Sequence, residues 1–261
     1  MNKKGIFTAV LAIFTLVIFT FAYYKIVFAP KTNYREVIGQ NQVKLYESYI
    51  DGEKIALYID ESAKQAAYSA ILDLAGNGGY SKDVLSDCGN VVGYNIWYIN
   101  GKECYPKNLK DRLSKNFVEE LDKYLANYEV ILFNDENIKG LRDFFNIHVD
   151  DGDKIEIYGK SREKYIFGVK TPEEYKIKYE MNPDFKQEIN YNFGDYNELK
   201  IIMAEPIRLC KSAECFNRVI DKKNYDWEIV DRDEYVLFKV NTKKKIFNDD
   251  VVVKFAIRTN P

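Results

Sequence analysis

The feature of the sequence that most constrains the fold is an uncharged run over residues 5–24, which directly follows Lys3 and Lys4. Lys25 and a shorter apolar patch over residues 26–29 come next. The hydrocarbon core of a bilayer requires about 20 apolar residues in a helix, whereas the apolar centre of a cleaved secretory signal is about 7–15 residues long. The run therefore predicts an uncleaved membrane anchor over residues 5–29, within an N-terminal segment 1–29.

Charge does not decide on which side of the membrane the remaining chain lies. Lys3 and Lys4 precede the apolar run, and Lys25, Lys31 and Arg35 follow it. Because cytoplasmic flanks normally carry the excess of basic residues, this near balance leaves the orientation open.

The four cysteines form two local couples, Cys88 with Cys104 and Cys210 with Cys215. Such couples are typical of disulfides in an oxidising compartment, so they favour an extracytoplasmic location. The second couple requires a helix break between its members, because a regular helix would hold them too far apart. Four buried reduced thiols remain the alternative. Zinc binding is disfavoured, since the only histidine, His148, lies beside neither couple.

A long helix is predicted after Pro30, with the segment 30–80 containing the helix and its stop signal. An apolar stripe recurs at spacings of three or four, which is the helical period. Its members are Leu45, Tyr49, Gly52, Ala56, Ile59, Ala63, Ala66, Ala70 and Leu74. Small residues let another backbone approach closely, so we expect burial along most of this stripe, and we call Gly52, Ala56, Ala63, Ala66 and Ala70 the seam. Its partner is either the domain's own core or a second molecule.

Residues 81–261 predict an extracytoplasmic α+β region that can be divided into two subdomains near residues 150–195. A second amphipathic helix is expected over residues 107–128, and the turn Asn100–Gly101 suggests a hairpin tip. Further helices are expected over residues 195–209 and 213–222. Strands are expected over residues 154–158, 165–169, 175–181, 185–193, 234–241 and 251–258. The predicted class is α+β, with an N-terminal transmembrane helix, a long amphipathic helix, and then mixed helices with an antiparallel β-sheet.

Few sequence features indicate catalysis. Nucleophile-elbow, phosphate-loop, dinucleotide and zinc-protease motifs are absent from the sequence, and a single histidine restricts both metal sites and catalytic triads. We expect His148 to be a strand or turn residue, and we expect no catalytic residue, metal or cofactor. A carboxylate-dependent hydrolase stays open, because its two acids have no fixed spacing; two carboxylates within about 10 Å in a cleft would favour it.

The charge balance argues against nucleic acid as a partner. Beyond residue 29, acidic residues outnumber basic ones by 40 to 35, since Lys3, Lys4 and Lys25 account for the other three of the 38 basic residues. A nucleic-acid-binding protein normally shows a basic stripe, whereas acids interleave here almost everywhere. The expected partners are the membrane, through residues 5–29, and a protein partner or a second copy of the chain.

Two resemblances add to this interpretation. Residues 2–10 resemble the class III signal of type IV pilin-like proteins, which implies cleavage between Gly5 and Ile6 and an apolar helix that serves as anchor and filament core. The sequence departs from that pattern at Val10, where most pilins carry glutamate. Residues 52–74, 78–80, 88–89, 94–97 and 104–106 are similar to uncharacterised membrane-anchored proteins of small-genome archaea. That family implies a cell-surface location and no particular activity.

The sequence thus predicts a non-enzymatic binding or assembly protein of the cell surface, anchored by one membrane span with its C-terminal domain outside. The alternatives are a type IV pilin-like subunit and a carboxylate-dependent hydrolase of the cell envelope.

Overall fold

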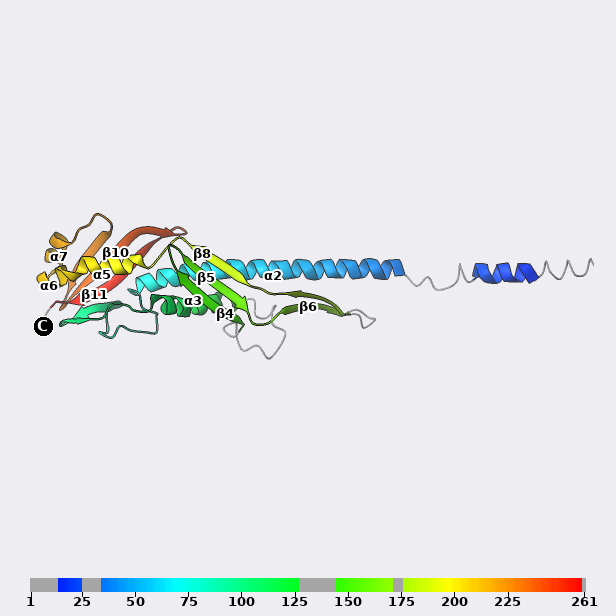
Figure 1. Cartoon of the computed structure of the whole chain (residues 1–261), viewed down its shortest axis with the longest axis horizontal. Coiled ribbons are helices and arrows are strands. Elements are labelled where there is room, and N and C mark those ends of the chain that lie inside the picture. The colour runs from blue at the N-terminus through cyan, green and yellow to red at the C-terminus, as the bar shows by residue number, and fades with distance from the viewer. Residues whose placement is uncertain (1–13, 25–33, 127–143, 171–175, 260–261) are drawn as a thin grey trace, which may run out of the picture. The chain divides into compact units, whose positions relative to one another are not determined.

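The computed structural model describes residues 14–24, 34–126, 144–170 and 176–259, and its α+β architecture agrees with the predicted class (Figure 1). The labelled helices are α2 (Tyr34–Gly76), α3 (Leu109–Ala126), α5 (Gly194–Ala204), α6 (Pro206–Leu209) and α7 (Ala213–Val219). The strands are β1 (Asn90–Val91), β2 (Tyr94–Ile99), β3 (Lys102–Glu103), β4 (Phe145–Asp151), β5 (Ile155–Ser161), β6 (Tyr165–Lys170), β7 (Lys176–Met181), β8 (Phe185–Ile189), β9 (Asp226–Arg232), β10 (Tyr235–Ile246) and β11 (Asp249–Arg258).

The described residues fall into two compact units. The first contains those within Met1–Ile50 and Gly168–Tyr179, and the second contains those within Asp51–Phe167 and Glu180–Pro261. Strands β6 and β7 form a two-stranded sheet, of which residues 168–170 and 176–179 belong to the first unit. The second unit holds the two larger sheets and the main core.

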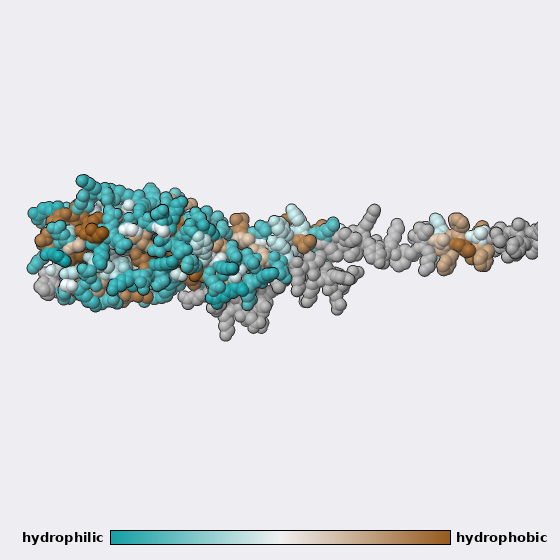
Figure 2. All heavy atoms as spheres, viewed as in Figure 1, coloured by the Kyte–Doolittle hydropathy of each residue, from teal (hydrophilic) through white to brown (hydrophobic). Residues whose placement is uncertain are grey.

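Part of the expected membrane anchor lies within the described residues. Residues 14–24 are helical and expose large apolar side chains to solvent (Figure 2). These are Phe14, Leu16, Val17, Ile18, Phe19, Phe21, Tyr23 and Tyr24. Within the described ranges, no helix combines the length and the apolar character that a membrane span requires. The rest of the anchor over residues 5–29, including Gly5 and Ile6, lies outside the described residues.

Helix α2 ends at the predicted glycine-rich stop. Gly78 and Gly79 have φ of +63° and +83°, and their amides donate to the carbonyls of Ala75 and Leu74 at 2.9 and 2.8 Å. A side chain at Gly79 would also meet Pro106 at 2.7 Å. Because only glycine adopts this left-handed geometry freely, the stop signal fixes where the chain leaves the helix.

The seam is buried by the second unit's own core over most of its length. Ala63, Ala66 and Ala70 have no exposed surface, and they belong to one cluster that includes residues from the sheets and from α3 and α5. The burial expected along most of the stripe does not reach its beginning, where Leu45 and Tyr49 are each 46% exposed. Both precede Asp51, at which the second unit begins, so they are not part of its core.

The larger sheet has the strand order β1-β2-β11-β10-β9, with β3 paired to β2. Its pairs are antiparallel except for β2 with β11, which run parallel. The predicted antiparallel sheet is thus present, with one parallel pair that the sequence did not predict. Strand β9 was not expected either, although Trp227 and Ile229 alternate there with exposed residues.

Aromatic rings join the strands of the larger sheet on its buried face. Trp97 of β2 stacks on Phe255 of β11 at 3.9 Å between ring centroids, and Phe255 stacks on Phe238 of β10 at 4.9 Å. The indole N–H of Trp97 donates to the carbonyl of Gly78 at 2.9 Å, just after α2. Trp97 thus fills the core and ties β2 to the end of α2.

The second sheet has the order β4-β5-β8 and is antiparallel. Phe185 of β8 lies over Gly159 of β5, and its ring also contacts Phe117 of α3. The amide of Gln187 donates to the Asp60 carboxylate of α2 at 2.7 Å. This sheet therefore packs on α2 and α3.

Candidate functional site

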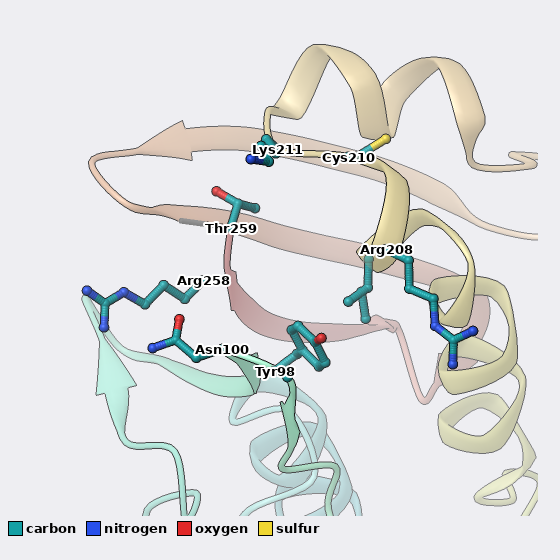
Figure 3. A pocket seen from close by; sticks show the side chains of 9 residues that line it. Tyr98, Asn100, Arg208, Cys210, Lys211, Arg258 and Thr259 are labelled. Carbon is teal, nitrogen blue, oxygen red and sulfur yellow. The ribbon is translucent and has the colours of Figure 1, made fainter. Parts of the chain in front are cut away.

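Two adjoining pockets form a groove in the second unit, which we call the basic groove, and Figure 3 shows the larger of them. The larger pocket has a volume of about 380 Å³ and the smaller about 120 Å³. The larger is lined by Tyr98, Asn100, Gly101, Ile207, Arg208, Cys210, Lys211, Arg258 and Thr259. The smaller shares Tyr98, Gly101, Ile207 and Arg208 and adds Glu103, Tyr105 and Ala204. A volume of this size is in the range of small-ligand sites.

One wall of the groove is the hairpin between β2 and β3. Asn100 and Gly101 have φ of +49° and +83°, the geometry of a two-residue hairpin turn, as the Asn-Gly sequence predicts. The predicted disulfide between Cys88 and Cys104 is present, with a Cα–Cα distance of 5.9 Å. Because Cys104 directly follows β3, this bond holds the hairpin in place.

The opposite wall is α6 together with the start of the following turn. Cys210 and Cys215 form the second predicted disulfide, with a Cα–Cα distance of 5.3 Å. The required helix break is present, since α6 ends at Leu209 and Ser212 caps α7. Cys210 itself lines the groove, so the bond fixes the residues beside it.

Positive charge dominates the groove. Figure 3 shows Arg258 and Asn100 on one side, Arg208 on the other, and Tyr98 and Thr259 between them. Arg258 pairs with Glu234 and lies over the ring of Tyr235.

Arg208 and Lys211 differ from Arg258 in having free charges. Both are exposed, and within the described part of the chain neither has a carboxylate within 4.0 Å. They can therefore contact a ligand without first breaking an ion pair.

Tyr98 and Tyr105 add flat, hydrogen-bonding surface to the groove. Burial raises the pKa of the Tyr105 hydroxyl to about 12, and the negative charge of Glu103 adds to this shift. The hydroxyl therefore stays protonated at neutral pH. The Lys200 ammonium lies 4.7 Å from the centre of the Tyr105 ring and pairs with Glu103 at 3.5 Å. Glu103 is the only carboxylate among the described lining residues, and its charge is matched by Lys200.

The residues singled out from the sequence fall in several places. Cys210 lines the groove and Cys104 lies between two lining residues, whereas Ala63, Ala66 and Ala70 of the seam are in the core. His148 is on β4, with an exposed side chain 3.2 Å from Asp150. Sequence reasoning missed Arg208 and Lys211, although their position beside a cysteine couple was a usable signal.

A convergent carboxylate pair exists away from the groove. Asp195 and Glu198 both accept a hydrogen bond from the Tyr225 hydroxyl, at 3.2 and 2.7 Å. Asp195 is buried, and neither acid lines the basic groove. No group of three or more acidic, histidine or cysteine side chains suited to a metal ion occurs among the described residues.

Comparison with protein-family models, with curated proteins and with solved structures gives no match in any of the three. The resemblance to archaeal surface proteins stays a prediction, and function is inferred from this chain's own residues.

Proposed function

We propose that this chain is a non-enzymatic binding protein of the cell surface, anchored through residues 5–29, whose basic groove holds an acidic polysaccharide. The observation that carries the proposal is the pair of exposed cations, Arg208 and Lys211, on a groove wall fixed by a disulfide. Carboxylates and sulfates on a glycan would receive charge-assisted hydrogen bonds from both side chains. Tyr98, Asn100 and Thr259 offer hydroxyl, amide and ring surfaces to sugar hydroxyls.

Three further features support a surface-exposed binding role. The disulfides suit an oxidising exterior, and each braces one wall, so little ordering cost opposes binding. The helical residues 14–24 expose apolar side chains that a bilayer would cover. The groove also lacks a convergent carboxylate pair among its described lining residues, which favours binding over glycoside hydrolysis.

The test uses the detergent-solubilised chain with oligogalacturonate, a carboxylated glycan, and with a neutral dextran oligomer for comparison. We expect binding to oligogalacturonate that weakens with salt, and an affinity loss of about tenfold or more in Arg208→Ala/Lys211→Ala, because each charged hydrogen bond contributes about 1.5–3 kcal/mol. The matched control is Lys107→Ala/Lys160→Ala, which removes two exposed charges elsewhere. Equal losses in both double variants would show non-specific attraction and contradict the proposal. Absence of binding to oligogalacturonate by the wild-type chain would also overturn it.

A pilin-like assembly role is the second candidate. It is favoured by exposed apolar side chains on the first part of α2, at Val43, Leu45 and Tyr46. Replacing all three with serine would weaken association of the chain in membranes if they form a subunit contact. Crosslinking of the intact membrane would measure this change, and an unaltered crosslinking pattern would remove the candidate.

A further inference from the structure

A lysine and an aspartate meet inside the second unit, away from the basic groove. Asp195 lies in the first turn of α5 and Lys244 near the end of β10. The Lys244 Nζ atom is 2.9 Å from Oδ1 of Asp195, across a sequence separation of 49 residues. The pair therefore joins two elements that are remote in the chain.

The surroundings of this pair partly exclude water. The Asp195 side chain is 5% exposed, and its Oδ2 atom has no hydrogen-bond partner among the described residues. Lys244 also lies 5.4 Å from the centre of the buried Tyr191 ring, while 38% of its own side chain remains exposed. The carboxylate is thus shielded, while the lysine side of the pair remains partly open to solvent.

A second carboxylate is linked to the same pair by a hydroxyl. Tyr225 contacts Oδ1 of Asp195 and Oε2 of Glu198, and Asn224 donates to Oε1 of Glu198 at 2.9 Å. The hydrogen bonds from Asn224 and Tyr225 hold the pKa of Glu198 below its ordinary value. Glu198 is therefore an ionised proton acceptor at neutral pH, connected to the pair through Tyr225.

We propose that Lys244 and Asp195 condense into an intramolecular isopeptide bond, with Glu198 carrying a proton through the Tyr225 hydroxyl. A proton first passes from the Lys244 ammonium to Asp195 along their hydrogen bond, which leaves a neutral amine and a neutral acid. The amine lone pair attacks Cγ, and a new N–Cγ bond forms. Glu198 takes one proton from the nitrogen and returns it to a hydroxyl on Cγ. The Cγ–O bond then breaks, and one water molecule leaves.

Proximity makes this condensation feasible without activation of the acid. An amine and a carboxylic acid free in water favour the separated form, but well-oriented groups within one molecule reach effective molarities of about 10⁵–10⁸ M. The Nζ–Oδ1 distance of 2.9 Å places the amine beside the carbonyl carbon before reaction. The bond would tie α5 to β10 permanently.

Peptide mapping of the reduced, digested full-length chain tests the proposal directly. We expect a branched peptide joining Lys244 to Asp195, lighter by one water molecule than its two parts. The ion pair Lys239–Glu228, at 3.1 Å but more exposed, serves as an internal control and should stay unlinked. Finding only unlinked Lys244 and Asp195 peptides, or equal linkage at the control pair, would overturn the proposal.

Variants separate the roles of the three groups. Lys244→Arg keeps the charge but removes the nucleophile, so no branched peptide should form. Asp195→Asn can still react, and its product should be lighter by ammonia. Glu198→Gln keeps a hydrogen-bonding side chain of the same shape, and we expect it to lose the linkage. Its circular dichroism spectrum should equal that of Lys244→Arg, which would show that both variants fold alike. Linkage at the wild-type extent in Glu198→Gln would overturn the assignment of Glu198 as proton carrier.

Discussion

Replacing Ala66 with leucine tests whether the seam is the core of the second unit or a contact between molecules. Ala66 has no exposed surface, and the neighbouring Ala63, Ala67 and Ala70 have none either. A leucine brings three additional carbon atoms into this contact. If space existed, their burial would stabilise the fold by about 0.8 kcal/mol each.

We expect no such space around Ala66, because Ala66 and the three alanines beside it are fully covered. Overpacking of this kind costs about 1–3 kcal/mol. For a domain of about 150–250 residues, 1 kcal/mol corresponds to about 2–4 °C, so we expect a melting temperature about 2–12 °C lower. Thermal unfolding of the full-length chain, followed by circular dichroism, measures this change.

Ala56→Leu is the matched control, because Ala56 belongs to the same stripe of the same helix but is only half-buried. We expect a much smaller change there, since part of the new side chain can point to solvent. An unchanged melting temperature in Ala66→Leu combined with weaker association would assign the seam to an assembly contact. Equal effects of the two substitutions would contradict the packing argument.

Two further predictions concern acid stability and topology. Burial raises the pKa of Glu120, but the charges of Lys123 and Lys82 outweigh it and hold that pKa below its ordinary value of 4.5. The ionised Glu120 side chain therefore stabilises the fold above pH 4.5, and this stabilisation is lost as the pH falls through the lower folded-state pKa. Glu120→Gln should flatten the pH dependence of the melting temperature below pH 4.5. A pH dependence equal to that of wild type in this variant would contradict the assignment. For topology, protease added to intact cells should digest the chain beyond residue 33, and protection until the membrane is permeabilised would contradict an external location.

Local patterns were sufficient to predict the elements whose signals lie close together in the chain. The stripe from Gly52 to Leu74 and the glycines that follow it define the buried part of α2, because both burial and the helix end depend on nearby residues. The two cysteine couples give the disulfides for the same reason, since each closes a short loop. The Asn100–Gly101 turn is equally local.

Features that depend on distant segments were not predictable in this way. The parallel pairing of β2 with β11 joins the first strands of the second unit to its last, and no local period encodes it. Strand β9 alternates only at Trp227 and Ile229, and charged residues occupy four of its seven positions, so its local signal is weak. The basic groove likewise combines Tyr98, Arg208 and Thr259, which come from three separate segments.

The position of the groove follows from how its three segments are held. Tyr98 follows Trp97, whose ring is stacked in the core, so β2 presents one wall from a rigid base. The opposite wall is a single helical turn, which would not be stable alone because helix formation has a costly nucleus. The bond from Cys210 to Cys215 compensates by fixing the chain directly after that turn. Because α6 alone is too short to hold Arg208 in place, this wall needs the local disulfide. The need for that disulfide explains why Cys210 lines the groove.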